Sequence, residues 1–132
     1  MAFAIQAIHN KLVLHRDIKP QNVFLTADKS VKIGDLGIAR ELNRASEMAK
    51  TMTGTISYMS PEVLDAKPYS YPSDIWALGC VLYEMCTFQL PFEGEGLGGI
   101  CDAVLNHPHV PIPAAHYSAN LRELIDRMLI KD

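Results

Sequence analysis

The sequence predicts a mainly helical domain with a few short β-strands, an α-rich α+β fold. Residues 73–88 are apolar on nearly every face, which is typical of a helix buried on all sides. Other segments carry apolar residues at helical spacing. Only two short runs, at 23–25 and 31–33, have the composition of strands. Helices therefore dominate the expected fold.

The first elements of the chain are a helix and a strand pair. Residues 2–10 have apolar side chains at helical spacing, and the helix is expected to end at Asn10. The strand candidates at 23–25 and 31–33 are separated by the turn-like sequence TADKS. We expect the two strands to pair antiparallel.

From Gly34 to about Thr55 the periodicity disappears, which predicts a long loop. Loops of this length inside a compact domain are commonly functional. The buried helix follows at about 73–88, with a Ser/Asp start signal. Its charged residues are Asp74 and Glu84.

The last part of the chain predicts two further helices. Residues 94–99 are expected to form a flexible loop, followed by a short helix over 100–107. A connector broken by prolines then leads to an amphipathic helix over 118–130, with Ser118 or Asn120 near its N-cap.

Composition excludes several classes of protein. The 132 residues fit one domain, with 48% apolar residues, 20% charged residues and a net charge of −3. This balance is neither that of a disordered chain nor basic enough to make nucleic acid the main partner. No apolar run is long enough to span a bilayer, so no membrane partner is expected. The N-terminal residues lack the features of a secretory signal.

The three cysteines are expected to be reduced. Cys80, Cys86 and Cys101 are odd in number and have neither zinc-site nor CxxC spacing. Reduced thiols in or near the core are typical of an intracellular protein.

Several motifs follow one another at consistent spacing. Residues 15–22 read HRDIKPQN, which fits the pattern H-R-D-L-x-x-x-N with Ile18 in place of leucine. Four further motifs come later: DLG at 35–37, GT at 54–55, SPE at 60–62 and DIWALGC at 74–80. In order and spacing, the whole chain resembles the C-terminal lobe of a serine/threonine protein kinase, with a catalytic loop at 15–22 and an activation segment at 35–62. It is most similar to the NIMA-related kinases.

The resemblance implies transfer of a phosphoryl group from ATP, with Mg²⁺, to serine or threonine of protein substrates. Asp17 would accept or orient the proton of the substrate hydroxyl, and Lys19 would place a cation near the γ-phosphate. Asn22 and Asp35 would offer oxygen ligands to Mg²⁺. Thr55 would hydrogen-bond the catalytic aspartate and lysine.

The resemblance also assigns packing and regulatory roles. Phe24 would close the floor of the adenine pocket, whereas His15 and Leu36 would pack inside the lobe. Arg16 and Arg40 would receive a phosphate on the activation segment. Thr51 is the preferred phosphorylation site, and Thr53 and Ser46 are weaker candidates. An ordinary solvated loop residue is the alternative for each hydroxyl.

Two patterns are rejected as sites. The sequence GEGLGG at 94–99 matches G-x-G-x-x-G, but no strand leads into it and Glu93 and Glu95 would repel a phosphate. His107 and His109 lie among prolines without a third metal ligand at suitable spacing. We expect both histidines to be exposed to solvent.

Motifs of the N-terminal kinase lobe do not occur in the sequence, which has no upstream glycine-rich hairpin and no V-A-I-K lysine. The arginine that pairs with the family counterpart of Glu62 does not occur either. We therefore expect the isolated chain to be inactive, with Glu62 lacking its usual partner. The alternative function is a non-catalytic kinase-like lobe that binds proteins. Family analogy suggests a cytoplasmic location, with association to cytoskeleton or centrosome.

Overall fold

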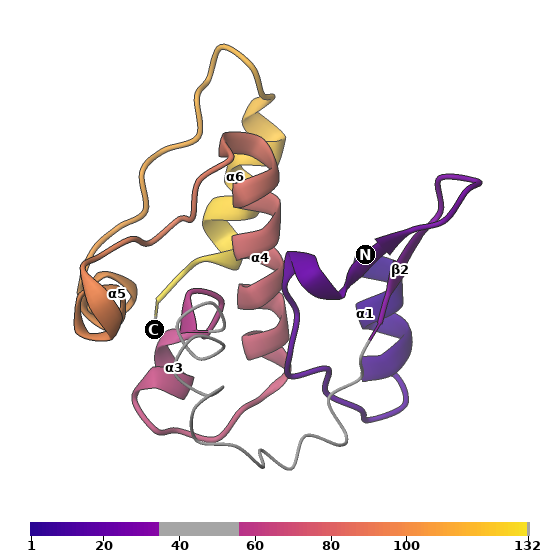
Figure 1. Cartoon of the computed structure of the whole chain (residues 1–132), viewed down its shortest axis with the longest axis horizontal. Helices are drawn as coiled ribbons and strands as arrows, with labels where there is room; N and C mark the ends of the chain where they lie inside the picture. The colour runs from indigo at the N-terminus through magenta and orange to yellow at the C-terminus, as the bar shows by residue number, and fades with distance from the viewer. Residues whose placement is uncertain (35–55, 132) are drawn as a thin grey trace.

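The structure, a computed structural model, describes residues 1–34 and 56–131 (Figure 1). Within these ranges the elements are α1 (Ala2–His9), the 3-10 helix η1 (Pro20–Asn22), β1 (Val23–Leu25), β2 (Val31–Ile33), α3 (Pro61–Leu64), α4 (Tyr71–Thr87), α5 (Gly96–Asn106) and α6 (Ala119–Met128). The α-rich fold class is confirmed. Seven residues singled out from the sequence lie outside the described residues: Asp35, Leu36, Arg40, Ser46, Thr51, Thr53 and Thr55.

The N-terminal elements are those that the sequence predicts. Helix α1 ends at His9, and the backbone N–H of Asn10 caps it by donating to the carbonyl of Gln6 at 2.9 Å. Strands β1 and β2 pair antiparallel, with Phe24 opposite Lys32. Lys29 turns the hairpin with a φ of 63°, a conformation common in tight turns.

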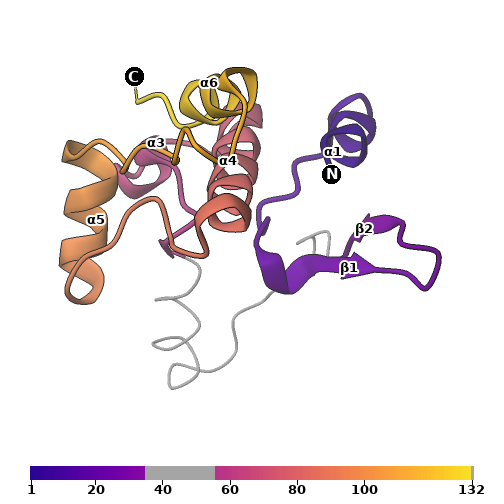
Figure 2. The same ribbon diagram turned by 90° about the horizontal axis from the view of Figure 1, so that it is seen from above.

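Helix α4 is the centre of the molecule. It lies between α1 and the hairpin on one side and the other helices on the other (Figures 1 and 2). Tyr71 begins α4 and Pro72 follows it, which suits a first helical turn whose N–H groups have no partner within the helix. The helix ends at Thr87, because Phe88 adopts a left-handed conformation with a φ of 57°.

Helix α6 packs closely along α4. A side chain on Gly79 of α4 would place its Cβ 2.9 Å from the Cβ of Met128, so glycine permits the close approach. Ser118 caps α6, and its hydroxyl accepts from the backbone N–H of Leu121 at 3.3 Å. Of the two predicted caps, Ser118 and Asn120, the structure has Ser118. The packed apolar side chains of this region include Trp76, Val81, Ile125 and Leu129.

The predicted loop over 94–99 is wrong from Gly96 onward. Helix α5 begins at Gly96, four residues before the predicted start. A side chain on Gly94 would collide with the backbone of Gly99. Gly94 and Gly99 therefore allow a close approach of the backbone at the start of α5. The sequence does not predict a helix at this point, because glycine has a low helix propensity. The segment that leads into α5 is not a strand. The sequence GEGLGG at 94–99 therefore lacks the strand that a nucleotide-binding glycine loop of this pattern follows.

Two further findings concern the whole fold. Cys80, Cys86 and Cys101 are all free thiols, as predicted. Within residues 1–34 and 56–131, no helix has both the length and the apolar character needed to cross a membrane.

Candidate active site

The structure brings together three residues that the sequence assigned to catalysis or metal binding. Nζ of Lys19 donates to Oδ1 of Asp17 at 2.8 Å. Nδ2 of Asn22 donates to Oδ2 of the same carboxylate at 2.9 Å and to the Asp17 carbonyl at 2.7 Å. Each carboxylate oxygen of Asp17 therefore has a defined donor, which fixes the orientation of the group.

Partial burial strengthens these contacts. The side chains of Lys19 and Asp17 are only 11% and 18% exposed, and Asn22 is 8% exposed. Hydrogen bonds to charged groups are stronger where water is partly excluded. Because Nδ2 of Asn22 donates, its amide oxygen is left as the atom that suits a hard cation such as Mg²⁺.

Hydrogen bonds also join the catalytic loop to the end of β2. The backbone N–H of Gly34 donates to the carbonyl of Asn22 at 2.9 Å. His15 is fully buried, and its Nε2 lies 3.2 Å from the carbonyl oxygen of Gly34. Nδ1 of His15 accepts from the backbone N–H of Asp17 at 3.3 Å. One ring nitrogen accepts and the other faces an acceptor, which suits a neutral imidazole.

Asp74, near the start of α4, anchors the catalytic loop. This carboxylate is fully buried. It accepts from the backbone N–H groups of His15 at 2.9 Å and Arg16 at 3.0 Å. It also accepts from the Tyr69 hydroxyl at 2.6 Å and contacts Nε2 of His9 at 2.7 Å. Burial raises the pKa of Asp74, but the hydrogen bonds outweigh burial and the pKa is lowered overall.

The anchor holds a strained backbone. Arg16 has a φ of 67°, a left-handed conformation that is uncommon for residues other than glycine. Asp74 binds the N–H of Arg16 and the N–H before it, so these bonds favour the strained conformation. The side chain of Arg16 is exposed.

The sequence alone predicts no role for Asp74. The feature of the sequence that points to Asp74 is its charge within a helix that is apolar on nearly every face. Such a charge must be paired, because burying an unpaired carboxylate is costly. The same signal applies to Glu84, which accepts from the Tyr58 hydroxyl at 2.6 Å. Burial and this carboxylate raise the pKa of Tyr58, so the phenol stays protonated.

A small cavity of about 80 Å³ lies beside the catalytic loop. The residues that line it include Asp17, Lys19, Tyr58, Met59 and Val63. Asp17 therefore lies near residues that follow the GT sequence at 54–55 in the chain.

The hairpin after the catalytic loop presents apolar side chains to solvent. Phe24 is 53% exposed and Leu25 is 75% exposed. The Phe24 ring lies so close to Gly34 that a Cβ there would be 2.6 Å from Cε2. An exposed aromatic ring beside the catalytic loop is available to a planar ligand, and the adenine-pocket role of Phe24 stays a prediction.

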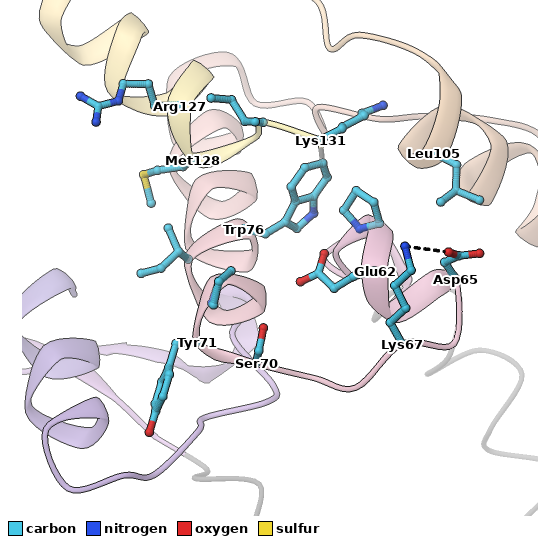
Figure 3. A pocket seen from close by; sticks show the side chains of 14 residues that line it. Glu62, Asp65, Lys67, Ser70, Tyr71, Trp76, Leu105, Arg127, Met128 and Lys131 are labelled. Atoms are coloured by element: carbon cyan, nitrogen blue, oxygen red, sulfur yellow. Dashed lines mark ion pairs between the residues drawn. The ribbon is translucent and has the colours of Figure 1, made fainter.

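A larger cavity of about 670 Å³ opens between α3, α4 and the end of α6 (Figure 3). Glu62 and Trp76 line it, and an ion pair between Lys67 and Asp65 at 3.0 Å lies beside it. Glu62, expected to lack its usual partner, accepts from the Ser73 hydroxyl at 2.6 Å. Burial opposes ionisation of Glu62, but this hydrogen bond and others lower its pKa overall.

The two histidines expected to be exposed differ. The side chain of His107 is 62% exposed, as expected. That of His109 is only 14% exposed, so the prediction for His109 is wrong. Its ring packs against aromatic side chains from elsewhere in the chain. Across the described ranges, no group of three or more histidine, cysteine or acidic side chains could hold a metal ion.

Comparison with known proteins agrees with the arrangement of the catalytic loop. The model of the protein kinase domain matches residues 1–132. The chain belongs to the protein kinase family. It is 45% identical to the serine/threonine-protein kinase Nek1 of Mus musculus over 128 residues and 47% identical to Nek4 of Mus musculus over 129 residues. It is 46% identical to Nek2 of Homo sapiens over 121 residues.

These matches cover 97%, 98% and 91% of this chain but only 11%, 16% and 27% of the respective relatives. The similarity to NIMA-related serine/threonine kinases is therefore confirmed over nearly the whole chain. The chain spans about a tenth to a quarter of the length of these relatives.

Proposed function

We propose that this chain supplies the catalytic loop of an ATP-dependent protein serine/threonine kinase. The observation that carries the proposal is the Asp17 carboxylate, oriented by Lys19 and Asn22. Phosphoryl transfer depends mainly on positioning and on charge neutralisation, and these three side chains provide both.

The residues divide the chemistry between them. Asp17 accepts the proton of a serine or threonine hydroxyl while Lys19 offsets the negative charge of the transferred group. Bound ATP with Mg²⁺ supplies the phosphoryl group. The amide oxygen of Asn22, with Asp35 by the family pattern, would hold the Mg²⁺.

Regulation and location extend this proposal. An exposed Arg16 beside Asp17 suits a phosphate on Thr51, with Arg40 as the second cation. The protein substrates carry serine or threonine acceptors. Free thiols at all three cysteines fit the reducing cytoplasm, and association with the cytoskeleton or centrosome is proposed from the family alone.

A chimera tests the proposal. Residues 1–132 replace the matching segment of mouse Nek4, and incorporation of radiolabel from ATP into a generic protein substrate is measured with Mg²⁺. We expect incorporation by the chimera and a loss of about 10²- to 10⁴-fold in Asp17→Asn, because the proton acceptor is removed. Asp28→Asn is the matched control, since Asp28 lies exposed in the hairpin turn, and its activity stays unchanged.

Two outcomes would overturn the proposal. One is a chimera that is folded, as shown by cooperative unfolding, but incorporates no phosphate. This result is expected if the chain is a non-catalytic lobe that binds proteins. The other is equal incorporation by the chimera and its Asp17→Asn variant. The isolated chain serves as the blank and is expected to show no turnover.

A further inference from the structure

The carboxylate of Asp74 has two polar contacts on each of its oxygens. Oδ1 accepts from the backbone N–H of Arg16 at 3.0 Å and from the hydroxyl of Tyr69 at 2.6 Å. Oδ2 accepts from the backbone N–H of His15 at 2.9 Å and lies 2.7 Å from Nε2 of His9. Each oxygen therefore contacts one backbone N–H of the catalytic loop and one side chain from another part of the chain.

The backbone of α4 does not by itself fix the direction of this carboxylate. Asp74 lies within the helix, so its Cα has little freedom. The last torsion of an aspartate side chain has a broad minimum, however, and the carboxylate can rotate about it. Rotation would carry Oδ1 out of line with the N–H of Arg16, and hydrogen bonds are directional. The side-chain donors therefore set how the carboxylate meets the catalytic loop.

Tyr69 is well placed to hold Oδ1. Ser70 is the N-cap of α4, so Tyr69 directly precedes the cap and Asp74 is the fourth residue of the helix. Side chains at these two positions lie close together, and their contact sets the direction in which the chain enters a helix. Here the contact is a hydrogen bond. Burial and the bond to Asp74 raise the pKa of Tyr69, so the hydroxyl stays protonated and donates.

The backbone of Arg16 depends on the bond to Oδ1. Its φ of 67° is left-handed. The strain of such a conformation and the strength of one hydrogen bond to a charged group are of similar size, so the margin that holds Arg16 in place is small. Asp17 follows Arg16 directly, and a change in the Arg16 backbone would turn the Asp17 carboxylate away from Lys19 and Asn22.

We propose that Tyr69 is a positioning residue for phosphoryl transfer. Its hydroxyl holds Oδ1 of Asp74 against the N–H of Arg16, and this bond in turn fixes the direction of Asp17. The inference rests on the catalytic role proposed for Asp17. The ring of Tyr69 also lines the small cavity beside Asp17. Because Tyr69→Phe keeps the ring, this substitution tests the hydroxyl alone.

Hydrogen exchange of single backbone amides, measured by NMR on the 132-residue chain, is the first test. Tyr69→Phe is expected to speed exchange of the Arg16 N–H about two- to tenfold, the change in equilibrium that one hydrogen bond gives. Exchange of the His15 N–H is expected to change less, because its acceptor is Oδ2. A general loss of stability would speed both amides equally. The dispersion of the amide spectrum verifies that the variant is folded.

Steady-state kinetics of the Nek4 chimera are the second test. Tyr69→Phe is expected to lower kcat about two- to tenfold, because fewer molecules hold Asp17 in the productive direction. KM for ATP and KM for the protein substrate are expected to stay unchanged. The assay is run at a temperature at which circular dichroism shows both proteins fully folded, so that an unfolded fraction does not contribute.

Tyr117→Phe is the matched control, because it removes a tyrosine hydroxyl far from the catalytic loop. The Tyr117 hydroxyl donates to the carbonyl of Cys86 at 2.9 Å. Cys86 lies twelve residues after Asp74 in α4, which is about 18 Å along the helix axis. This variant also loses one hydrogen bond, but exchange of the Arg16 N–H and kcat are expected to stay unchanged.

Three results would overturn the proposal. The first is exchange of the Arg16 N–H that is unchanged or slower in Tyr69→Phe. The second is equal acceleration at Arg16 and His15. The third is a kcat equal to that of the parent chimera. If the parent chimera incorporates no phosphate, the proposed function fails, whereas exchange of the Arg16 N–H still decides whether Tyr69 holds the loop.

Discussion

The two described parts of the chain, of which the second contains α4, bury different kinds of side chain. Residues 1–34 contribute two buried apolar side chains, Ile5 and Ile18, together with the buried polar groups of His15 and Asn22. Residues 56–131 contribute all the other buried apolar side chains of the described core. Polar bonds hold the first part, whereas apolar packing holds the second.

This difference fits the proposed function. Hydrogen bonds are directional and fix a backbone in one conformation, which suits the catalytic role proposed for residues 15–22. Apolar packing is not directional and suits a supporting scaffold. The cost is that the catalytic loop depends on one side chain, Asp74, which receives bonds from four different residues.

The largest effect is therefore expected from Asp74→Ala. The substitution leaves the N–H groups of His15 and Arg16 and the Tyr69 hydroxyl without their acceptor. Removing one partner of a buried charged network costs about 3–5 kcal/mol. Urea denaturation of the chain, followed by circular dichroism, measures the lost free energy of unfolding.

Asp65→Ala is the matched control, because the side chain of Asp65 is 60% exposed and pairs with the exposed Lys67. Its free energy of unfolding is expected to change by less than about 0.5 kcal/mol. Because folding lowers the pKa of Asp74, its charged form stabilises the fold above about pH 4. That contribution is lost as the pH falls through the folded pKa. Equal free energies of unfolding for Asp74→Ala and Asp65→Ala would contradict the role of Asp74 in anchoring residues 15 and 16.

Much of the fold follows from local pattern. Both strands, α1 and most of α4 lie where the composition and spacing of apolar residues predict them. The start of α5 does not, because Gly96, Gly98 and Gly99 disfavour a helix locally. Packing against the backbone of Gly94 permits it, and this contact is not visible in sequence spacing.

The site divides in the same way. Asp17, Lys19 and Asn22 lie within a few residues of each other, so a motif is enough to bring them together. Asp74 lies 58 residues from Arg16 along the chain, and only the three-dimensional fold shows their contact. His109 was mistaken for an exposed residue for this reason, since its partners come from α4 and α6.

The next effect tests the apolar attachment. A Cβ on Gly79 would lie 2.9 Å from Met128 and 3.1 Å from Leu129. Gly79→Ala therefore overfills the contact between α4 and α6 and is expected to cost about 1–3 kcal/mol. Urea denaturation measures the loss of free energy of unfolding.

Gly98→Ala makes the same change on α5, where a Cβ would meet nothing within 4 Å. Because alanine favours helices over glycine, this variant is expected to gain about 0.5–1 kcal/mol. Opposite signs for the two variants would separate packing from helix propensity. A gain in both would show that α4 and α6 are not in tight contact at Gly79.

The smallest effect is expected at the far end of α4, where neither force acts. Phe88 has a φ of 57° and is 91% exposed, so it bears backbone strain with little packing in return. Phe88→Gly relieves that strain and is expected to raise the free energy of unfolding by about 0.5–1 kcal/mol. Met85→Gly is the matched control, because Met85 is 63% exposed inside the helix and glycine there costs about 1 kcal/mol. A loss of stability in Phe88→Gly, measured by urea denaturation, would mean that the Phe88 ring is held by contacts that its exposure does not reveal.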